Sequence, residues 1–127
     1  MFKNLLFPID QSKEAFETAN KAIQLAKNHQ SHIIMLSVVQ PDRPEMHDSE
    51  FVASLLRRAK EQMEQAGISC EVLEKQGKPA FVICDVADDL NVDLIVMGTR
   101  GINLETADES TAARVIQLAP CPVLVVP

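Results

Sequence analysis

The stretch DLIVMGTRGINLETADESTAARVIQLAPCPVLVVP, residues 93–127, decides the fold of this chain. Its apolar run DLIVM leads into the glycine turn GTRG, and an acidic loop follows. A segment with helical spacing then connects to a second apolar run, CPVLVV. Apolar runs of this length, joined through a helix, are typical of parallel strands that are buried on both faces. The stretch therefore predicts a strand, helix and strand at the end of an α/β fold.

The preceding residues repeat this alternation. We expect strands at residues 2–9, 32–39, 68–75, 92–97 and 121–126. We expect helices from Ser12 to about His29, at residues 50–66, at residues 79–90 and after Asp108, the last with its apolar stripe on Ala112, Val115, Ile116 and Ala119. Gly67 occupies the position of a left-handed helix cap, and Pro8 should end the pairing of the first strand. Strands that alternate with helices predict a five-stranded parallel sheet with helices on both faces.

Composition places the chain among ordinary soluble domains. It has 127 residues, of which 46% are hydrophobic and 24% charged, so we expect one domain over residues 1–127. The net charge of -6 opposes nucleic acid, because phosphate contacts need clustered Lys and Arg. Neither an apolar run of membrane-spanning length nor a signal-peptide pattern is present in the sequence, so we expect a cytoplasmic protein without a membrane partner.

Cysteine and histidine spacing predicts neither a disulfide framework nor a metal site. Cys70, Cys84 and Cys121 are widely spaced, without a CxxC pair, and we expect free buried thiols. The three histidines, His29, His32 and His47, do not suggest a metal site either. We also find no arrangement of Ser, His and Asp, and no paired acid and base, that suggests hydrolytic catalysis, so we expect binding rather than turnover.

Three of the predicted strands have carboxyl ends whose residues are more than part of an apolar core. These carboxyl ends are residues 8–10, 38–39 and 97–101. Open parallel sheets bind ligands beyond such ends, where the strand order reverses. If the first and fourth strands are neighbours, Asp10 and Gly98 share one crevice. There a carboxylate can accept from a ribose hydroxyl or an amine, and glycines let backbone N–H groups approach phosphate. Two alternatives stay open: Asp10 can cap the first helix, and the glycines can be turn residues.

Five segments together resemble the universal stress protein family of the single-domain type: FPIDQS (7–12), LSVV (36–39), GKPAFVI (77–83), DLIVMGTRG (93–101) and APCPVLVV (119–126). The match covers nearly the whole chain. The resemblance implies an adenine nucleotide alpha hydrolase-like fold with strand order 3-2-1-4-5. It also implies a homodimer across the last strands and a role in the stress response.

The resemblance also implies a binding site. In the members that bind ATP, the adenine lies near the positions of Asp10 and Val38, and the phosphates lie near the glycine motif. The candidate nucleotide-binding residues are therefore Pro8, Ile9, Asp10, Val38, Met97, Gly98, Arg100, Gly101, Ser110 and Thr111. The expected cofactor is ATP or AMP, with Mg²⁺ if a triphosphate binds.

The phosphate motif departs from the family pattern, which is Gly, two residues, Gly, nine residues, then Gly followed by Ser or Thr. Gly98 and Gly101 are kept, but the third glycine is not. Counting forward from Gly101 leads to Thr111, whereas counting back from the last strand puts Glu109 in that place, followed by Ser110. Thr106 to Glu109 also has the spacing of a capping box, whose side chains take the N–H groups that a phosphate would use.

The charge of this loop opposes a triphosphate. Glu105, Asp108 and Glu109 put three carboxylates into this loop, and Arg100 is the cation that precedes them in sequence. A carboxylate about 4 Å from a phosphate charge costs on the order of 4 kcal/mol at an effective dielectric of 20. A loss of that size lowers affinity about a thousandfold. This repulsion does not act on the adenosine end of a nucleotide, so AMP is disfavoured less than ATP.

The last strand predicts a dimer. Pro122 within CPVLVVP indicates an edge strand, and residues 123–126 leave that edge apolar. A second copy is the natural cover, so we expect homodimerisation through Cys121 to Val126. The leading hypothesis is a dimeric regulatory module of the stress response. Two alternatives remain: an ATP-binding switch with slow hydrolysis or autophosphorylation at Ser110 or Thr111, and a flavin or redox module on the same fold.

Overall fold

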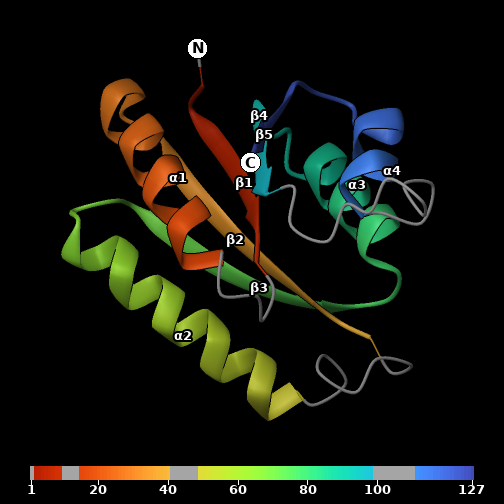
Figure 1. Ribbon diagram of the computed structural model, residues 1–127, viewed down its shortest axis with the longest axis horizontal. Helices are drawn as coiled ribbons and strands as arrows, with labels where there is room; N and C mark the ends of the chain where they lie inside the picture. Colours follow the sequence, from red (N-terminus) through yellow and green to blue (C-terminus); the bar gives the residue numbers. More distant parts are fainter. Residues whose placement is uncertain (1, 10–14, 41–48, 99–110) are drawn as a thin grey trace.

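The structure is a computed structural model that describes residues 2–9, 15–40, 49–98 and 111–127. Its five strands form one parallel sheet in the order β3-β2-β1-β4-β5 (Figure 1), as predicted. The strands are β1 (Asn4–Pro8), β2 (His32–Val39), β3 (Cys70–Gln76), β4 (Leu94–Gly98) and β5 (Val123–Val126). The helices are α1 (Ala15–His29), α2 (Ser49–Gln65), α3 (Pro79–Asp89) and α4 (Thr111–Leu118). In the described part of the chain, no helix is both long and apolar enough to cross a membrane.

The helices cover the sheet in two pairs, α1 with α2 on one face and α3 with α4 on the other (Figure 1). Successive residues of a strand point to opposite faces, so each strand supplies two separate apolar clusters. On β2, Ile33, Met35 and Val39 belong to the cluster with α1 and α2, whereas Ile34, Leu36 and Val38 belong to the cluster with α3 and α4. This division explains why β2 reads as a continuous apolar run.

Three helices end in a left-handed residue. Gly67 after α2 has φ 77°, which confirms the predicted cap, and Ile68 N–H donates to the Met63 carbonyl at 3.0 Å. Gln30 after α1 and Asn91 after α3 have φ 53° and 51°. Each of these residues turns the chain directly into the next strand, where the backbone reverses direction.

The structure corrects two predictions about α4 and β5. Ile116 is 55% exposed, whereas Ala112 and Val115 are buried, so the buried stripe of α4 is narrower than its spacing suggested. The reason is that α4 packs on α3 and on β5, and β5 is the edge strand, so no further strand of the described chain lies beneath the outer side of α4. The strand β5 begins at Val123 rather than Cys121. Likewise, β1 is shorter than the predicted residues 2–9, because it spans only Asn4–Pro8.

Candidate functional site

The carboxyl ends of β1 and β4 are adjacent but do not pair with each other. The two strands pair at Leu5↔Leu94 and Leu6↔Ile95, and β1 continues only along β2, as far as Pro8↔Leu36. The β4 strand continues only along β5, as far as Gly98↔Val126. This is the point where the strand order reverses, since β2 and β3 follow on one side and β5 on the other. Such a switch point is where open parallel sheets bind ligands.

Pro8 explains why the pairing stops on one side. The carbonyl of Lys3 accepts from His32 of β2, and the carbonyl of Asn4 accepts from Asp93 next to β4. By the alternation of a strand, the nitrogen of Pro8 then faces β4, where proline has no hydrogen to donate. On the β2 side the ladder runs on, because Ile9 N–H donates to the Leu36 carbonyl at 2.9 Å. The strand β1 therefore ends at Pro8, as predicted, and its last residues pair with β2 alone.

The described candidate residues gather around this switch point. Ile9 is buried among the residues that face α1 and α2, and Val38 and Met97 are buried together in the cluster that faces α3 and α4. Gly98 is the last residue of β4. Of these candidates, Ile9 therefore belongs to one face of the sheet, and Val38 and Met97 belong to the other.

The remaining candidates belong to the start of α4 and its preceding loop. Thr111 is the first described residue of α4 and is half-buried. The predictions for Asp10, Arg100, Gly101 and Ser110 lie outside the described residues. The same is true of the proposed capping box from Thr106 to Glu109.

A glycine turn brings the start of α3 to the same edge. Gly77 N–H donates to the carbonyl of Val39, the last residue of β2, at 3.1 Å. Gly77 has φ 144°, and a Cβ there would come within 2.9 Å of Val82 Cγ2. Only glycine fits this position without strain. The turn therefore fixes the N-terminus of α3 beside the carboxyl ends of β2 and β3.

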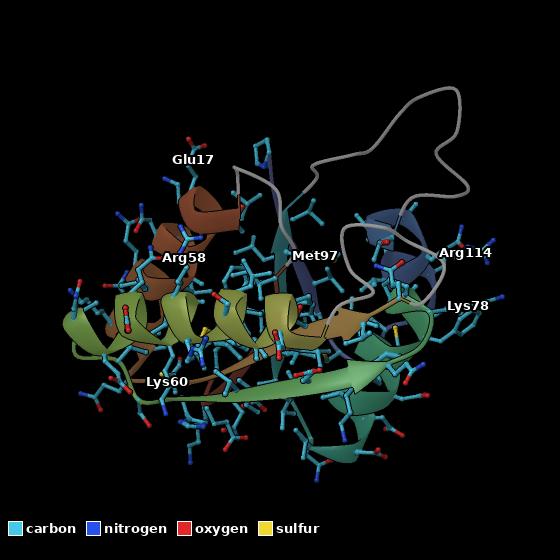
Figure 2. The ribbon with its side chains drawn as sticks, turned by 90° about the horizontal axis from the view of Figure 1, so that it is seen from below. Glu17, Arg58, Lys60, Lys78, Met97 and Arg114 are labelled. Carbon is cyan, nitrogen blue, oxygen red and sulfur yellow. The ribbon has the colours of Figure 1, made fainter. Side chains whose placement is uncertain are left out.

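Two cations stand at the first turns of α3 and α4, and the sequence prediction missed both. Lys78 is the N-cap of α3 and makes no capping side-chain bond, and Arg114 lies in the described first turn of α4. Both side chains are exposed, and Figure 2 shows them on the side of the molecule that α3 and α4 form. Neither first turn contains an acidic residue among those described. Positive side chains and helix N-termini both favour an anion here.

The three thiols are free, as predicted, although only Cys84 is buried and Cys70 and Cys121 are half-buried. Burial raises the pKa of each, with further increases from Glu64 at Cys70 and from Asp85 at Cys84. They are therefore neutral at physiological pH and are poor nucleophiles. In the described ranges, no three His, Cys, Asp or Glu side chains are grouped so that they could hold a metal ion.

A second polar group lies at the opposite, amino end of the sheet. The Nδ1 atom of His32 is 2.7 Å from Ser69 Oγ, and its Nε2 atom is 3.7 Å from Glu71 Oε2. No Ser–His–acid arrangement is evident in the sequence, and the structure brings one together. The register Ile33↔Cys70 places His32 beside Ser69, and this pairing is not visible in either segment alone.

Comparisons with known proteins match a single family over the whole chain. The model of the universal stress protein family matches residues 1–127. Universal stress protein Sll1654 of Synechocystis sp. is 49% identical over 136 residues, which cover 100% of this chain and 87% of that protein. Universal stress protein MJ0531 of Methanocaldococcus jannaschii is 32% identical, over 99% of this chain and 82% of that protein.

Solved structures share the architecture. A universal stress protein in complex with cAMP superposes with a TM-score of 0.85 at 22% identity, over 98% of this chain and 96% of that one. The universal stress protein from Archaeoglobus fulgidus in complex with dAMP superposes with a TM-score of 0.79 at 20% identity, over 100% of both chains. At these identities the likeness concerns the fold. The family match over the whole length and the 49% identical relative show that this chain belongs to the universal stress protein family.

Proposed function

We propose that this chain is a single-domain, homodimeric regulatory protein of the cytoplasm that binds an adenine nucleotide at the switch point between β1 and β4. The observation that carries the proposal is that the carboxyl ends of β1 and β4 lie next to each other without pairing to each other, with candidate residues from β1, β2 and β4 around them. A stress-response role follows from the family. The crystallised family members with cAMP, dAMP and AMP support an adenine nucleotide as the ligand class.

The adenosine end rests on the strand termini. Ile9, Val38 and Met97 are each at most 6% exposed and supply apolar walls for an adenine ring. Pro8 keeps the β1 and β4 ends unpaired, which leaves their carbonyl groups available to the ligand. Asp10 follows directly in sequence, and its carboxylate would accept from the ribose hydroxyls or the adenine amine.

The phosphate end rests on the helix starts. Gly98 and Gly101 would let backbone N–H groups approach one phosphate group, and Ser110 and Thr111 would donate hydroxyls to it. Lys78 and Arg114 add positive charge from α3 and α4. The three carboxylates of residues 105–109 oppose additional phosphate charge, so we assign AMP or another monophosphate ahead of ATP. Arg100 would pair with the phosphate or with one of these carboxylates.

The dimer rests on β5. This strand is at the edge of the sheet, and its Leu124 side chain is 42% exposed. An uncovered apolar edge pairs readily with another strand, and the same edge of a second copy is complementary to it. The proposed interface is Cys121 to Val126.

Calorimetric titration with AMP, ADP and ATP plus Mg²⁺ tests the nucleotide proposal. We expect AMP to bind more tightly than ATP. Glu109→Gly and Glu109→Gln should both raise ATP affinity and leave AMP affinity nearly unchanged, because both remove the carboxylate charge. Only Glu109→Gly also supplies a glycine, so the comparison separates the effect of charge from that of backbone freedom. Unaltered ATP affinity in both variants would rule out the electrostatic argument. An absence of heat with every nucleotide at millimolar concentration would rule out nucleotide binding itself.

A second candidate function is an ATP-binding switch with slow hydrolysis or autophosphorylation, with Mg²⁺ bound to the triphosphate. The observation in its favour is the hydroxyl of Thr111 at the start of α4, next to Ser110 in sequence. Intact-mass measurement after incubation with MgATP separates it from the first. Gain of one phosphate, lost in a Ser110→Ala/Thr111→Val double variant, would support the switch, and an unchanged mass without ADP release would exclude it.

A further inference from the structure

The group Ser69, His32 and Glu71 is held in place by paired backbone. His32 is the first residue of β2, and Ser69 directly precedes β3. The Ser69 carbonyl accepts from Ile33 N–H at 2.9 Å, so the two backbones are fixed next to the side-chain contact. Glu71 is two residues beyond Ser69 and therefore points to the same face of the sheet. The three side chains thus share one face at the amino end of β2 and β3.

We propose that Ser69 is a nucleophile that His32 activates and Glu71 orients, and that it accepts an acyl group from an activated ester. The distance from Ser69 Oγ to His32 Nδ1, 2.7 Å, is that of a hydrogen bond between a nucleophile and its base. Glu71 Oε2 lies 3.7 Å from Nε2 and favours the tautomer with its proton on that nitrogen. The Nδ1 lone pair then accepts the serine proton.

The roles are those of a Ser–His–acid triad with the two ring nitrogens exchanged. Triads are defined by geometry and role, so the order of the residues in the chain does not matter. The base and the acid are both reachable from solvent, because the side chains of His32 and Glu71 are 32% and 52% exposed. An ester in solution can therefore approach the group directly.

The reaction is an acyl transfer. Ser69 Oγ attacks the carbonyl carbon of a thioester or aryl ester while its proton passes to His32 Nδ1. The tetrahedral intermediate collapses, the bond to the thiolate or phenolate breaks, and the leaving group takes the proton from the imidazolium. The products are an ester on Ser69 and a free thiol or phenol, and water can later hydrolyse the ester. The substrate class is activated esters, because thiolates and phenolates leave far more easily than the amine of an amide.

This site is separate from the proposed nucleotide site. His32 and Val38 stand at opposite ends of β2, and six residues at about 3.3 Å each place them roughly 20 Å apart. Acylation of Ser69 and binding of AMP should therefore be independent. One can fail experimentally without affecting the other.

The experiment treats the full chain with p-nitrophenyl acetate and with a fluorophosphonate probe, followed by intact-mass analysis and peptide mapping. We expect a single label on Ser69, and none on Ser31, whose Oγ donates to the Phe2 carbonyl. Ser69→Ala should abolish labelling. His32→Gln should slow it roughly a hundredfold, the usual size of a general-base contribution.

Glu71→Gln, with Glu74→Gln on the same strand as the matched control, separates a positioning role from a general change in charge. We expect slower labelling only in Glu71→Gln, and partial rescue in Glu71→Asp. Circular dichroism of each variant checks that the overall fold is retained. Labelling that His32→Gln leaves unchanged, or that spreads over several serines and lysines at equal rates, would overturn the proposal.

Discussion

Asp93 and Asn4 bind each other twice. The N–H of Asn4 donates to Asp93 Oδ2 and the N–H of Asp93 donates to the Asn4 carbonyl, both at 2.9 Å. The same Oδ2 atom also accepts from Lys3 N–H at 2.9 Å. These bonds join the amino ends of β1 and β4, whereas the carboxyl ends of the two strands do not pair with each other. The two strands are thus fixed at one end and open at the other.

We therefore expect Asp93→Ala to lower the free energy of unfolding by about 1–2 kcal/mol, since two backbone donors lose a charged acceptor. Urea denaturation of the variant measures the loss. Asp85→Ala, an exposed position on α3 with the same change in charge, is the control and should stay within about 0.5 kcal/mol of the unaltered protein. Equal losses in both variants would contradict the role of Asp93.

Gly77→Ala should destabilise the protein more than Gly67→Ala. Both residues have positive φ, so alanine brings backbone strain of about 1–2 kcal/mol at either position. At Gly77 the new Cβ also meets Val82 Cγ2 at 2.9 Å, whereas at Gly67 nothing lies within 4 Å. Thermal and urea unfolding of the two variants compare the costs directly.

The Gly77 variant also tests the site. Displacement of this turn would move the start of α3, so AMP affinity should fall in Gly77→Ala and persist in Gly67→Ala. Titration at a temperature where both variants are folded separates binding from stability. Full AMP affinity in Gly77→Ala would show that Lys78 and the α3 N-terminus are not needed for binding.

Alkaline pH should destabilise the protein through its thiols. Burial, and then Asp85, raises the pKa of Cys84, and burial and then Glu64 raises that of Cys70. In the unfolded chain a thiol ionises near pH 8.5, so above that pH the unfolded state binds fewer protons than the folded state and stability falls. Below that pH the thiols are protonated in both states and do not make stability depend on pH. The chain has no tyrosine, which removes one of the competing titrations near pH 10.

Urea midpoints between pH 7.5 and 10, under reducing conditions, measure this slope. Cys84→Ala should make the slope shallower, even though it lowers stability at every pH through lost packing. A slope that is identical with and without the Cys84 thiol would refute the assignment.

Leu124→Lys should convert the dimer to a monomer. A lysine on β5 would place like charges opposite each other across the proposed interface and remove apolar contact. Light scattering after size exclusion gives the mass, with Leu90→Lys at the end of α3 as the control, since Leu90 is 41% exposed and Leu124 42%. We expect a dimer in the control only. A monomeric unaltered protein at micromolar concentration would reject the proposed dimer.

Residues 32–39 show how far sequence alone reaches. They are predicted as a strand buried on both faces, and β2 has those same bounds. The reason is local and strong, because eight consecutive residues without Gly or Pro, nearly all apolar, fit only a central strand at this length. Gly67 is equally clear, since a left-handed cap favours glycine. By contrast, Ile116 keeps helical spacing but is exposed, because spacing does not reveal how far the sheet extends beneath a helix.

The sequence by itself determined the five strands, the four helices, the family and the residues at the strand ends, because each rests on periodicity, turn chemistry or a contiguous motif. The tertiary structure decided what lies side by side. The one-sided stop of β1 at Pro8 depends on which strand its nitrogen faces, and the meeting of His32 with Ser69 depends on strand register. Lys78 and Arg114 share one side of the molecule for the same reason, since α3 and α4 both begin at the carboxyl edge of a parallel sheet. Register and helix direction are set by packing between segments far apart in the chain, and no local pattern encodes them.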